Sequence, residues 1–204
     1  MNAAQISRGL KALARKDADL KQAIKVFGAP APRIRPPGFE TFLGTIVSQQ
    51  ISPAAASAIL GRVKTLLPSL SPAGLDAVSD DALRGAGLSY RKIEYLRGLA
   101  KAEQAGSFQS NRLDTLSDDE AIAQITALKG FGVWTAEIYL MFSLGREDIF
   151  PANDLALQVA LARLKGLETK PTPKQARALT AHWQPWRSVG SLFLWHYYQG
   201  APVS

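Results

Sequence analysis

Leu128-Lys-Gly-Phe-Gly-Val-Trp-Thr-Ala136 carries the strongest local signal in this chain of 204 residues. Gly130 and Gly132 flank one apolar residue directly before a predicted helix. Both glycines can adopt positive φ angles, which permits a tight hairpin with outward-facing N–H groups. With the free N–H groups at the start of the next helix, these donors form a site for one phosphate. The alternative is an ordinary loop with a helix C-cap, the commoner use of an isolated Gly-x-Gly pair.

Helices are predicted on both sides of this hairpin. Ser117 and Glu120 form a capping box at the start of the helix before it. The helix after it presents Trp134, Ile138 and Met141 at helical spacing, a stripe that is more typical of core than of a ligand site. Asp154 opens a further helix, over 154–164. There it acts either as an N-cap or as a chemical group.

The rest of the chain also has helical periodicity. One helix is predicted over residues 3–27, ending at Gly28. Four prolines within 29–38 predict an extended connection. Further helices are predicted from Phe39 to about Gln49, over 54–67 after a Ser52 cap, over 89–105, after Thr172 and through Trp195. No strand signal and no internal repeat stand out, so we expect an all-α fold.

Composition limits the classes of function. The net charge of +7 favours a polyanionic partner, although the basic residues are dispersed and composition fits a merely basic protein equally well. The sequence has no cysteine, which excludes disulfides, thiolate nucleophiles and cysteine-ligated zinc or iron-sulfur sites. No apolar run reaches the roughly 18 residues that a membrane span needs. The basic N-terminus fits a transit peptide, but Ile6, Leu10 and Leu13 favour an ordinary amphipathic helix, so we expect a cytoplasmic protein.

Four ordered motifs resemble the helix-hairpin-helix DNA glycosylase superfamily, and within it the DNA-3-methyladenine glycosylase II branch. They are Leu128-x-Gly-x-Gly-x-x-Thr-Ala136 followed by Asp154, Phe39-Glu-Thr-Phe-Leu-Gly-Thr-Ile-Val-Ser-Gln-Gln-Ile-Ser52, Gly87-Leu-Ser-Tyr-Arg-Lys-Ile93, and Pro185-Trp-Arg-Ser188 with Trp195. The resemblance covers roughly residues 38–200. It implies two helical lobes with the active-site cleft between them. The terminal lobe would comprise 1–37 with 144–204, and the central lobe 38–143, with the motif at about 119–143. The N-terminal α/β domain of larger bacterial relatives is expected to be missing.

The resemblance implies a base-excision-repair enzyme that flips a damaged nucleotide and hydrolyses its N-glycosidic bond. The expected substrates are alkylated purines such as 3-methyladenine, and the product is an abasic site. Asp154 is the expected catalytic carboxylate, because an oxocarbenium-like transition state needs a nearby negative charge. Trp134, Trp195 and Ile138 are the expected base-pocket residues, the tryptophans stacking on a cationic base. Bifunctional relatives such as endonuclease III have a Schiff-base lysine where this chain has Trp134, so no lyase activity is expected.

Contacts with double-stranded DNA that contains a damaged base are also implied, with the protein as a monomer. Gln50, with Gln49, would be the wedge that enters the duplex. The residues expected to contact phosphate are Gly130, Gly132, Thr135 and Lys129. No cofactor is required and no iron-sulfur cluster is expected. Relatives often hold a monovalent cation on hairpin carbonyls, here those of Thr126, Leu128 and Phe131.

Two other functions fit the same sequence. A glycosylase for another damaged or mismatched base would share Asp154 and differ in pocket shape. Ile138, which stands where the family can have tyrosine, favours that alternative. A non-catalytic helix-hairpin-helix module would only grip DNA, and it would need neither Asp154 nor both tryptophans.

Overall fold

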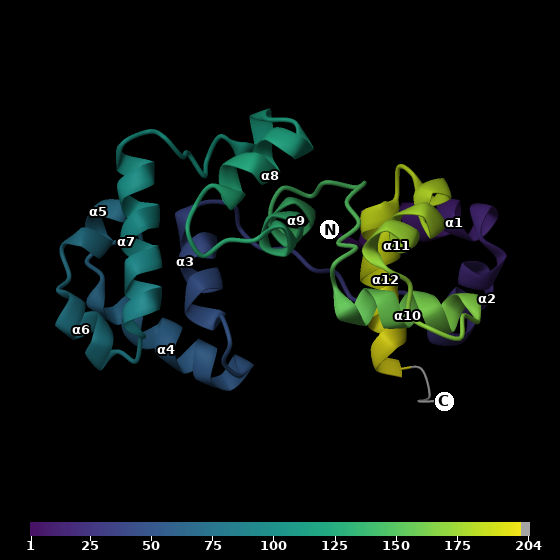
Figure 1. Cartoon of the computed structure of the whole chain (residues 1–204), viewed down its shortest axis with the longest axis horizontal. Coiled ribbons are helices and arrows are strands. Elements are labelled where there is room, and N and C mark those ends of the chain that lie inside the picture. Colours follow the sequence, from purple (N-terminus) through teal and green to yellow (C-terminus); the bar gives the residue numbers. More distant parts are fainter. Residues whose placement is uncertain (201–204) are drawn as a thin grey trace. The chain divides into compact units, whose positions relative to one another are not determined.

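The computed structural model describes residues 1–200, which form helices and no strand (Figure 1). The predicted all-α class is therefore confirmed. The chain divides into two compact units. The terminal unit comprises Met1–Ile34 with the chain from Glu137 onward, and the central unit is Arg35–Ala136. No helix in the described part of the chain has the length and apolar character needed to cross a membrane.

The second boundary between the units lies inside α9 (Val133–Phe142), whereas the sequence placed it after this helix, at 143/144. The C-terminal half of α9 packs into the terminal unit. There the Phe142 ring lies 6.0 Å from that of Trp195 and 4.4 Å beneath the guanidinium of Arg33. Because these contacts tie Phe142 to both ends of the chain, the boundary moves to the middle of the helix.

The terminal unit is built from helices contributed by both ends of the chain. They are α1 (Ala3–Lys16), α2 (Ala18–Phe27), α10 (Leu155–Lys165), α11 (Pro173–Leu179), the 3-10 helix η2 (Ala181–Trp183) and α12 (Arg187–Gly200). α12 packs against α1 and α10 (Figure 1). Leu13, Leu20, Trp183 and Phe193 are completely buried between these helices. The apolar faces of helices far apart in sequence thus form one core.

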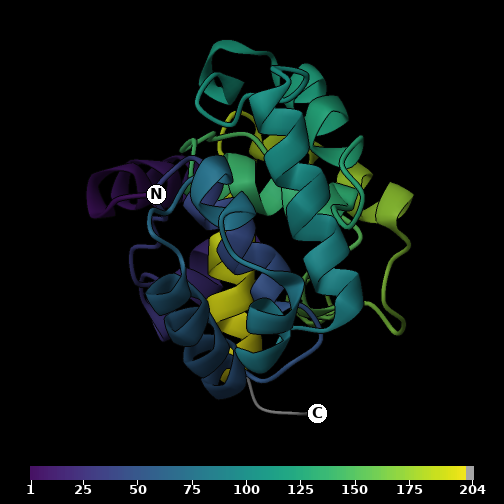
Figure 2. The same cartoon turned by 90° about the vertical axis from the view of Figure 1, so that its left-hand side faces the viewer.

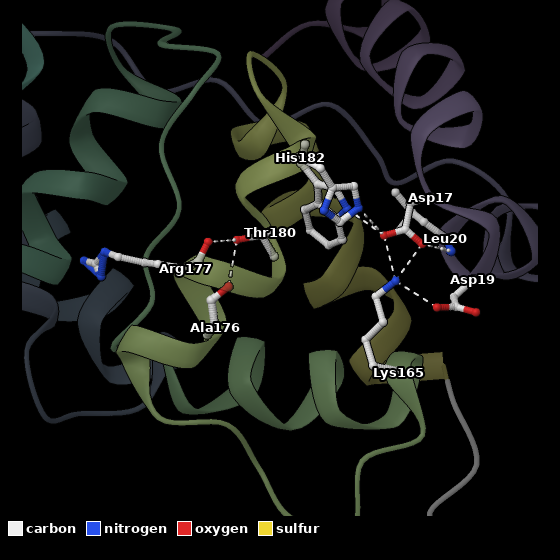
Figure 3. A network of polar contacts seen from close by, with 9 residues as sticks. Asp17, Asp19, Leu20, Lys165, Ala176, Arg177, Thr180 and His182 are labelled. Atoms are coloured by element: carbon white, nitrogen blue, oxygen red, sulfur yellow. Dashed lines mark hydrogen bonds and ion pairs between the residues drawn. The ribbon is translucent and has the colours of Figure 1, made fainter.

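Asp17 breaks the helix that the sequence predicted over residues 3–27. The structure has two helices there, and Asp17 between them is extended, at φ −139° and ψ 109°. Its carboxylate caps α2 by accepting the N–H of Leu20 at 3.1 Å, and it also accepts from Lys165 Nζ at 2.8 Å (Figure 3). Burial raises the pKa of Asp17, but the hydrogen bonds that its carboxylate accepts, first that from Lys165, lower the pKa to about 2. The break therefore depends on partners that are distant in sequence.

The central unit consists of shorter helices around α7. They are α3 (Phe39–Ser48), α4 (Pro53–Leu66), α5 (Pro72–Asp76), α6 (Asp80–Gly85), α7 (Tyr90–Gln104), the 3-10 helix η1 (Leu113–Thr115) and α8 (Asp118–Thr126), followed by the start of α9. In Figure 2, α7 is the long teal helix, and it packs against α3 and α5. Each helix from α4 to α8 begins with a serine whose side chain accepts an N–H of the first turn. The predicted caps, the Ser117–Glu120 capping box among them, are confirmed.

Candidate active site and DNA-binding hairpin

The two glycines of the hairpin have different structural roles. Gly130 has a φ of +95°, and a Cβ atom there would lie 2.4 Å from the ring of Tyr95. Gly132 does not have a positive φ, and a Cβ atom there would meet nothing within 4 Å. The expectation that both glycines use positive φ is therefore wrong for Gly132. Its carbonyl accepts the N–H of Ala136 at 3.1 Å, so Gly132 lies directly before α9 and accepts a hydrogen bond from its first turn. The space that a Cβ atom at Gly132 would enter is open.

Two neighbouring helices hold the hairpin. Gln49, at the end of α3, donates from its side-chain amide to the carbonyl of Gly130 at 2.8 Å. Tyr95 of α7 lies against the same glycine. Phe131 is buried, with its ring edge-on to Phe42 of α3 at 5.4 Å. Since its amide is used in this way, Gln49 fits the role of a brace for the hairpin better than the predicted role of a wedge.

Gln50 is exposed and strained. Its φ is +56°, and it is the one non-glycine residue among residues 1–200 with a positive φ. Such a conformation costs free energy, and residues that keep it cluster at functional positions. The conformation is compatible with the wedge role, which stays a prediction for Gln50.

The remaining DNA-contact candidates lie on or next to the hairpin. Lys129 is 69% exposed and forms an ion pair with Glu94 of α7. Thr135 is half-buried in the first turn of α9. An approaching phosphate would thus compete with a surface ion pair at Lys129, a type of pair that stabilises a protein little.

The proposed cation ligands are carbonyl oxygens at the same turn. Thr126 is the last residue of α8, where carbonyls lack helical partners. Leu128 accepts the N–H of Phe131 at 3.2 Å, which uses one of its two lone pairs. Carbonyl oxygens of this kind suit a hard monovalent cation, so the residues fit the group, and the site stays a prediction. Within residues 1–200, no cluster of three or more His, Asp or Glu side chains offers a metal site of another kind.

In the apolar stripe of α9 formed by Trp134, Ile138 and Met141, only the first residue is exposed. Trp134 has 46% of its surface exposed, whereas Ile138 and Met141 are buried. Tryptophan side chains are large and are usually mostly buried in a folded protein. Trp195, on α12, is half-buried against Phe142. Trp134 thus presents an aromatic face directly after the hairpin, while Ile138 contributes little surface.

Asp154 has the capping role that the sequence offered, and its chemical role stays a prediction. It is the N-cap of α10, and its Oδ1 accepts the N–H of Leu157 at 3.0 Å. The side chain is half-buried. A carboxylate has two oxygens with lone pairs, so it can accept further hydrogen bonds in addition to the capping one. The start of α10 orients the carboxylate, and its N–H groups interact favourably with the negative charge.

Glu137, which the sequence analysis did not select, lies near Asp154. It sits in the middle of α9 with only 4% of its surface exposed, and its Oε1 lies 3.4 Å from Nη2 of Arg177. Burial raises the pKa of Glu137 to about 7; the charge of Arg177 opposes this shift and that of Asp154 adds to it. The signal was present in the sequence, because Glu137 is the one acidic residue in the apolar helix Val133–Phe142.

Comparisons with known proteins show which family and which relatives the chain resembles. The family described as "HhH-GPD superfamily base excision DNA repair protein" matches residues 43–185. DNA-3-methyladenine glycosylase 1 of Schizosaccharomyces pombe is 30% identical over 186 residues, which are 88% of this chain and 82% of that protein. A crystal structure of a DNA-3-methyladenine glycosidase from Bacillus halodurans has a TM-score of 0.86 and 36% identity, covering 94% of this chain and 89% of that one. The S. pombe 3-methyladenine DNA glycosylase in complex with abasic DNA has a TM-score of 0.83 and 28% identity, covering 97% and 99%.

Proposed function

The chain belongs to the HhH-GPD superfamily of base excision DNA repair proteins, and from this membership we propose that it is a monofunctional DNA glycosylase for alkylated bases. The resemblance found in the motifs is thereby confirmed. Relatives named DNA-3-methyladenine glycosylase support the substrate class and the hydrolytic reaction. The observation in the structure that carries the proposal is Trp134, a half-exposed tryptophan directly after the hairpin.

Trp134 is suited to an alkylated base for an electrostatic reason. A purine alkylated on a ring nitrogen carries a positive charge, and the face of an indole attracts cations. Stacking on Trp134 and Trp195 would therefore favour such a base over a normal one once the nucleotide is flipped. Because position 134 has no amine, no Schiff base forms there and the DNA strand is left uncut.

Asp154 would act on the sugar. As the bond between C1′ and the base nitrogen breaks, its electron pair leaves with the base, which departs neutral and needs no general acid. Positive charge then develops on the sugar, and the carboxylate of Asp154 stabilises it and orients a water molecule. The water oxygen bonds to C1′, its proton passes to solvent, and an abasic site remains.

The DNA-binding part of the proposal rests on the hairpin. The relative in complex with abasic DNA supports DNA as the partner of this chain. We infer that the substrate is double-stranded DNA with a damaged base, bound by a monomer. Gly130, Gly132, Thr135 and Lys129 would contact phosphate, and Gln50 would enter the duplex. The hairpin cation and the cytoplasmic location remain part of the proposal.

A base-release assay tests this function. Methylated duplex DNA is incubated with the protein, and the released bases are identified by mass. We expect free 3-methyladenine from the wild type and no strand cleavage. Asp154→Asn should keep DNA binding while base release falls by orders of magnitude, because the charge is lost at nearly constant shape.

Three results would contradict the proposal. Release by Asp154→Asn within a factor of two of the wild type would remove Asp154 from the catalytic role. Trapping of the wild type on DNA by borohydride would contradict the monofunctional assignment. Release of a different base, with alkylated purines left in place, would establish another substrate class.

A further inference from the structure

Glu137 has a buried oxygen without a partner. Its Oε2 is inaccessible to solvent and has no hydrogen bond in the structure. Buried polar atoms in native proteins are nearly always paired, so each exception calls for an explanation. Burying a charge in such surroundings is more costly still. A glutamine or a leucine would avoid that cost, so the carboxyl at this position needs a reason other than packing.

The charged groups that face Glu137 come from two other elements. Arg177, on α11, approaches its Oε1, and Figure 3 shows the Arg177 side chain extending from α11 away from the Asp17 network. Asp154, at the start of α10, acts on Glu137 as a like charge. Arg177 is 46% exposed and therefore well screened by solvent. Glu137 therefore experiences opposite effects from a screened cation and from the proposed catalytic anion.

We propose that Glu137 is a positioning residue that sets the net charge around Asp154, so that its proton controls how strongly the site stabilises a cationic transition state. The inference rests on the proposed function of Asp154. When Glu137 holds its proton, Asp154 alone supplies negative charge. When the proton leaves to solvent, a second negative charge adds to the stabilisation of the developing sugar cation.

The direction of the effect follows from the protonation of Glu137. Because burial raises the pKa of Glu137 to about 7, its proton leaves near neutral pH. The rate of base release should therefore increase as pH rises through that range. At an effective dielectric constant of about 20, a unit charge roughly 12 Å from the reacting atoms corresponds to roughly a tenfold change in rate, and a closer charge to a larger one.

The first test compares wild type and Glu137→Gln, which has nearly the same shape and no titrating proton. Single-turnover release of 3-methyladenine from duplex DNA is measured from pH 5.5 to pH 9. We expect the ratio of the wild-type rate to the variant rate to increase by roughly tenfold across this range. The ratio cancels any titration of the substrate, and circular dichroism at each pH checks that both proteins are folded.

The second test observes the Glu137 carboxyl directly by NMR in protein carrying ¹³C-labelled glutamate. Asp154→Asn should lower its titration midpoint, because a like charge is removed. Arg177→Gln should raise it. Lys174→Gln is the matched control, since it removes one positive charge from an exposed position on the same helix. It should leave the midpoint in place.

The outcomes separate this inference from the proposed function. Base release that survives in Asp154→Asn would overturn the function. Loss of release in Asp154→Asn, together with a rate ratio independent of pH, would overturn the inference alone. If the titration midpoint of Glu137 is the same in Asp154→Asn as in the wild type, the inference is also overturned. This second result does not require Glu137→Gln to fold.

Discussion

Alanine substitutions at the two hairpin glycines should affect different properties. Gly130→Ala should reduce the stability of the fold, and Gly132→Ala should reduce DNA binding. At Gly130, a non-glycine residue at positive φ costs about 1 to 2 kcal/mol. Its Cβ atom would also press on the Tyr95 ring, whose nearest atoms lie 2.4 to 2.9 Å away, and overpacking of this kind costs about 1 to 3 kcal/mol. The two effects add to about 2 to 5 kcal/mol for Gly130→Ala. At Gly132 neither applies, and the change in stability should stay within about 1 kcal/mol.

Urea unfolding followed by circular dichroism measures the stability of both variants, and fluorescence anisotropy measures their binding to duplex DNA. Gly132→Ala should fold like the wild type and bind DNA of every sequence more weakly, because its methyl group obstructs the N–H donors at the start of α9. Binding by all variants should weaken steeply as salt rises. Combining Gly130→Ala with Tyr95→Ala should remove the steric part of the Gly130 cost and leave the backbone part.

Two results would refute this reasoning. If Gly132→Ala binds DNA as tightly as the wild type, the hairpin is not the phosphate anchor. If Gly130→Ala is as stable as the wild type, the contact with Tyr95 and the positive φ do not matter for the fold.

Three further predictions concern single side chains. Trp134→Ala should destabilise the fold by about 1 to 2 kcal/mol in urea unfolding, less than the about 3 to 5 expected for a buried tryptophan, and should impair release of firmly bonded bases more than release of 3-methyladenine. Because the pKa of Asp17 is lowered to about 2, its contribution to the free energy of unfolding is complete above pH 4, and about 2 kcal/mol is lost as pH falls towards 2. Urea denaturation at pH 2.5 and pH 5 should show this loss, and the Asp17→Asn variant should lack it. The raised pKa of Glu137 means that unfolding releases a proton between pH 4.5 and about 7, so stability should fall by about 3 kcal/mol as pH rises through that window; a slope that persists in Glu137→Gln would rule this out.

Local features of this protein followed from short stretches of its sequence. The serine caps at Ser52 and Ser117 could be predicted because a cap needs only the residues of one helical turn. The proline-rich connection over 29–37 is extended, as expected from the fixed φ of proline. The motif around Gly130, followed by Asp154, was sufficient to identify the family, because the motif is defined by residue types at fixed positions along the chain.

Features that depend on distant residues could not be predicted in this way. The helix break at Asp17 needs Lys165, which lies 148 positions away, and the burial of Glu137 needs the helices packed around α9. Trp134 and Met141 occupy the same apolar stripe, yet one is 46% exposed and the other is buried. Periodicity shows which side chains share a helix face, but what covers that face depends on how the helices pack. Exposure, the pKa values of buried carboxyls and the difference between Gly130 and Gly132 arise from such packing, because each depends on atoms that only the folded chain brings within a few ångströms.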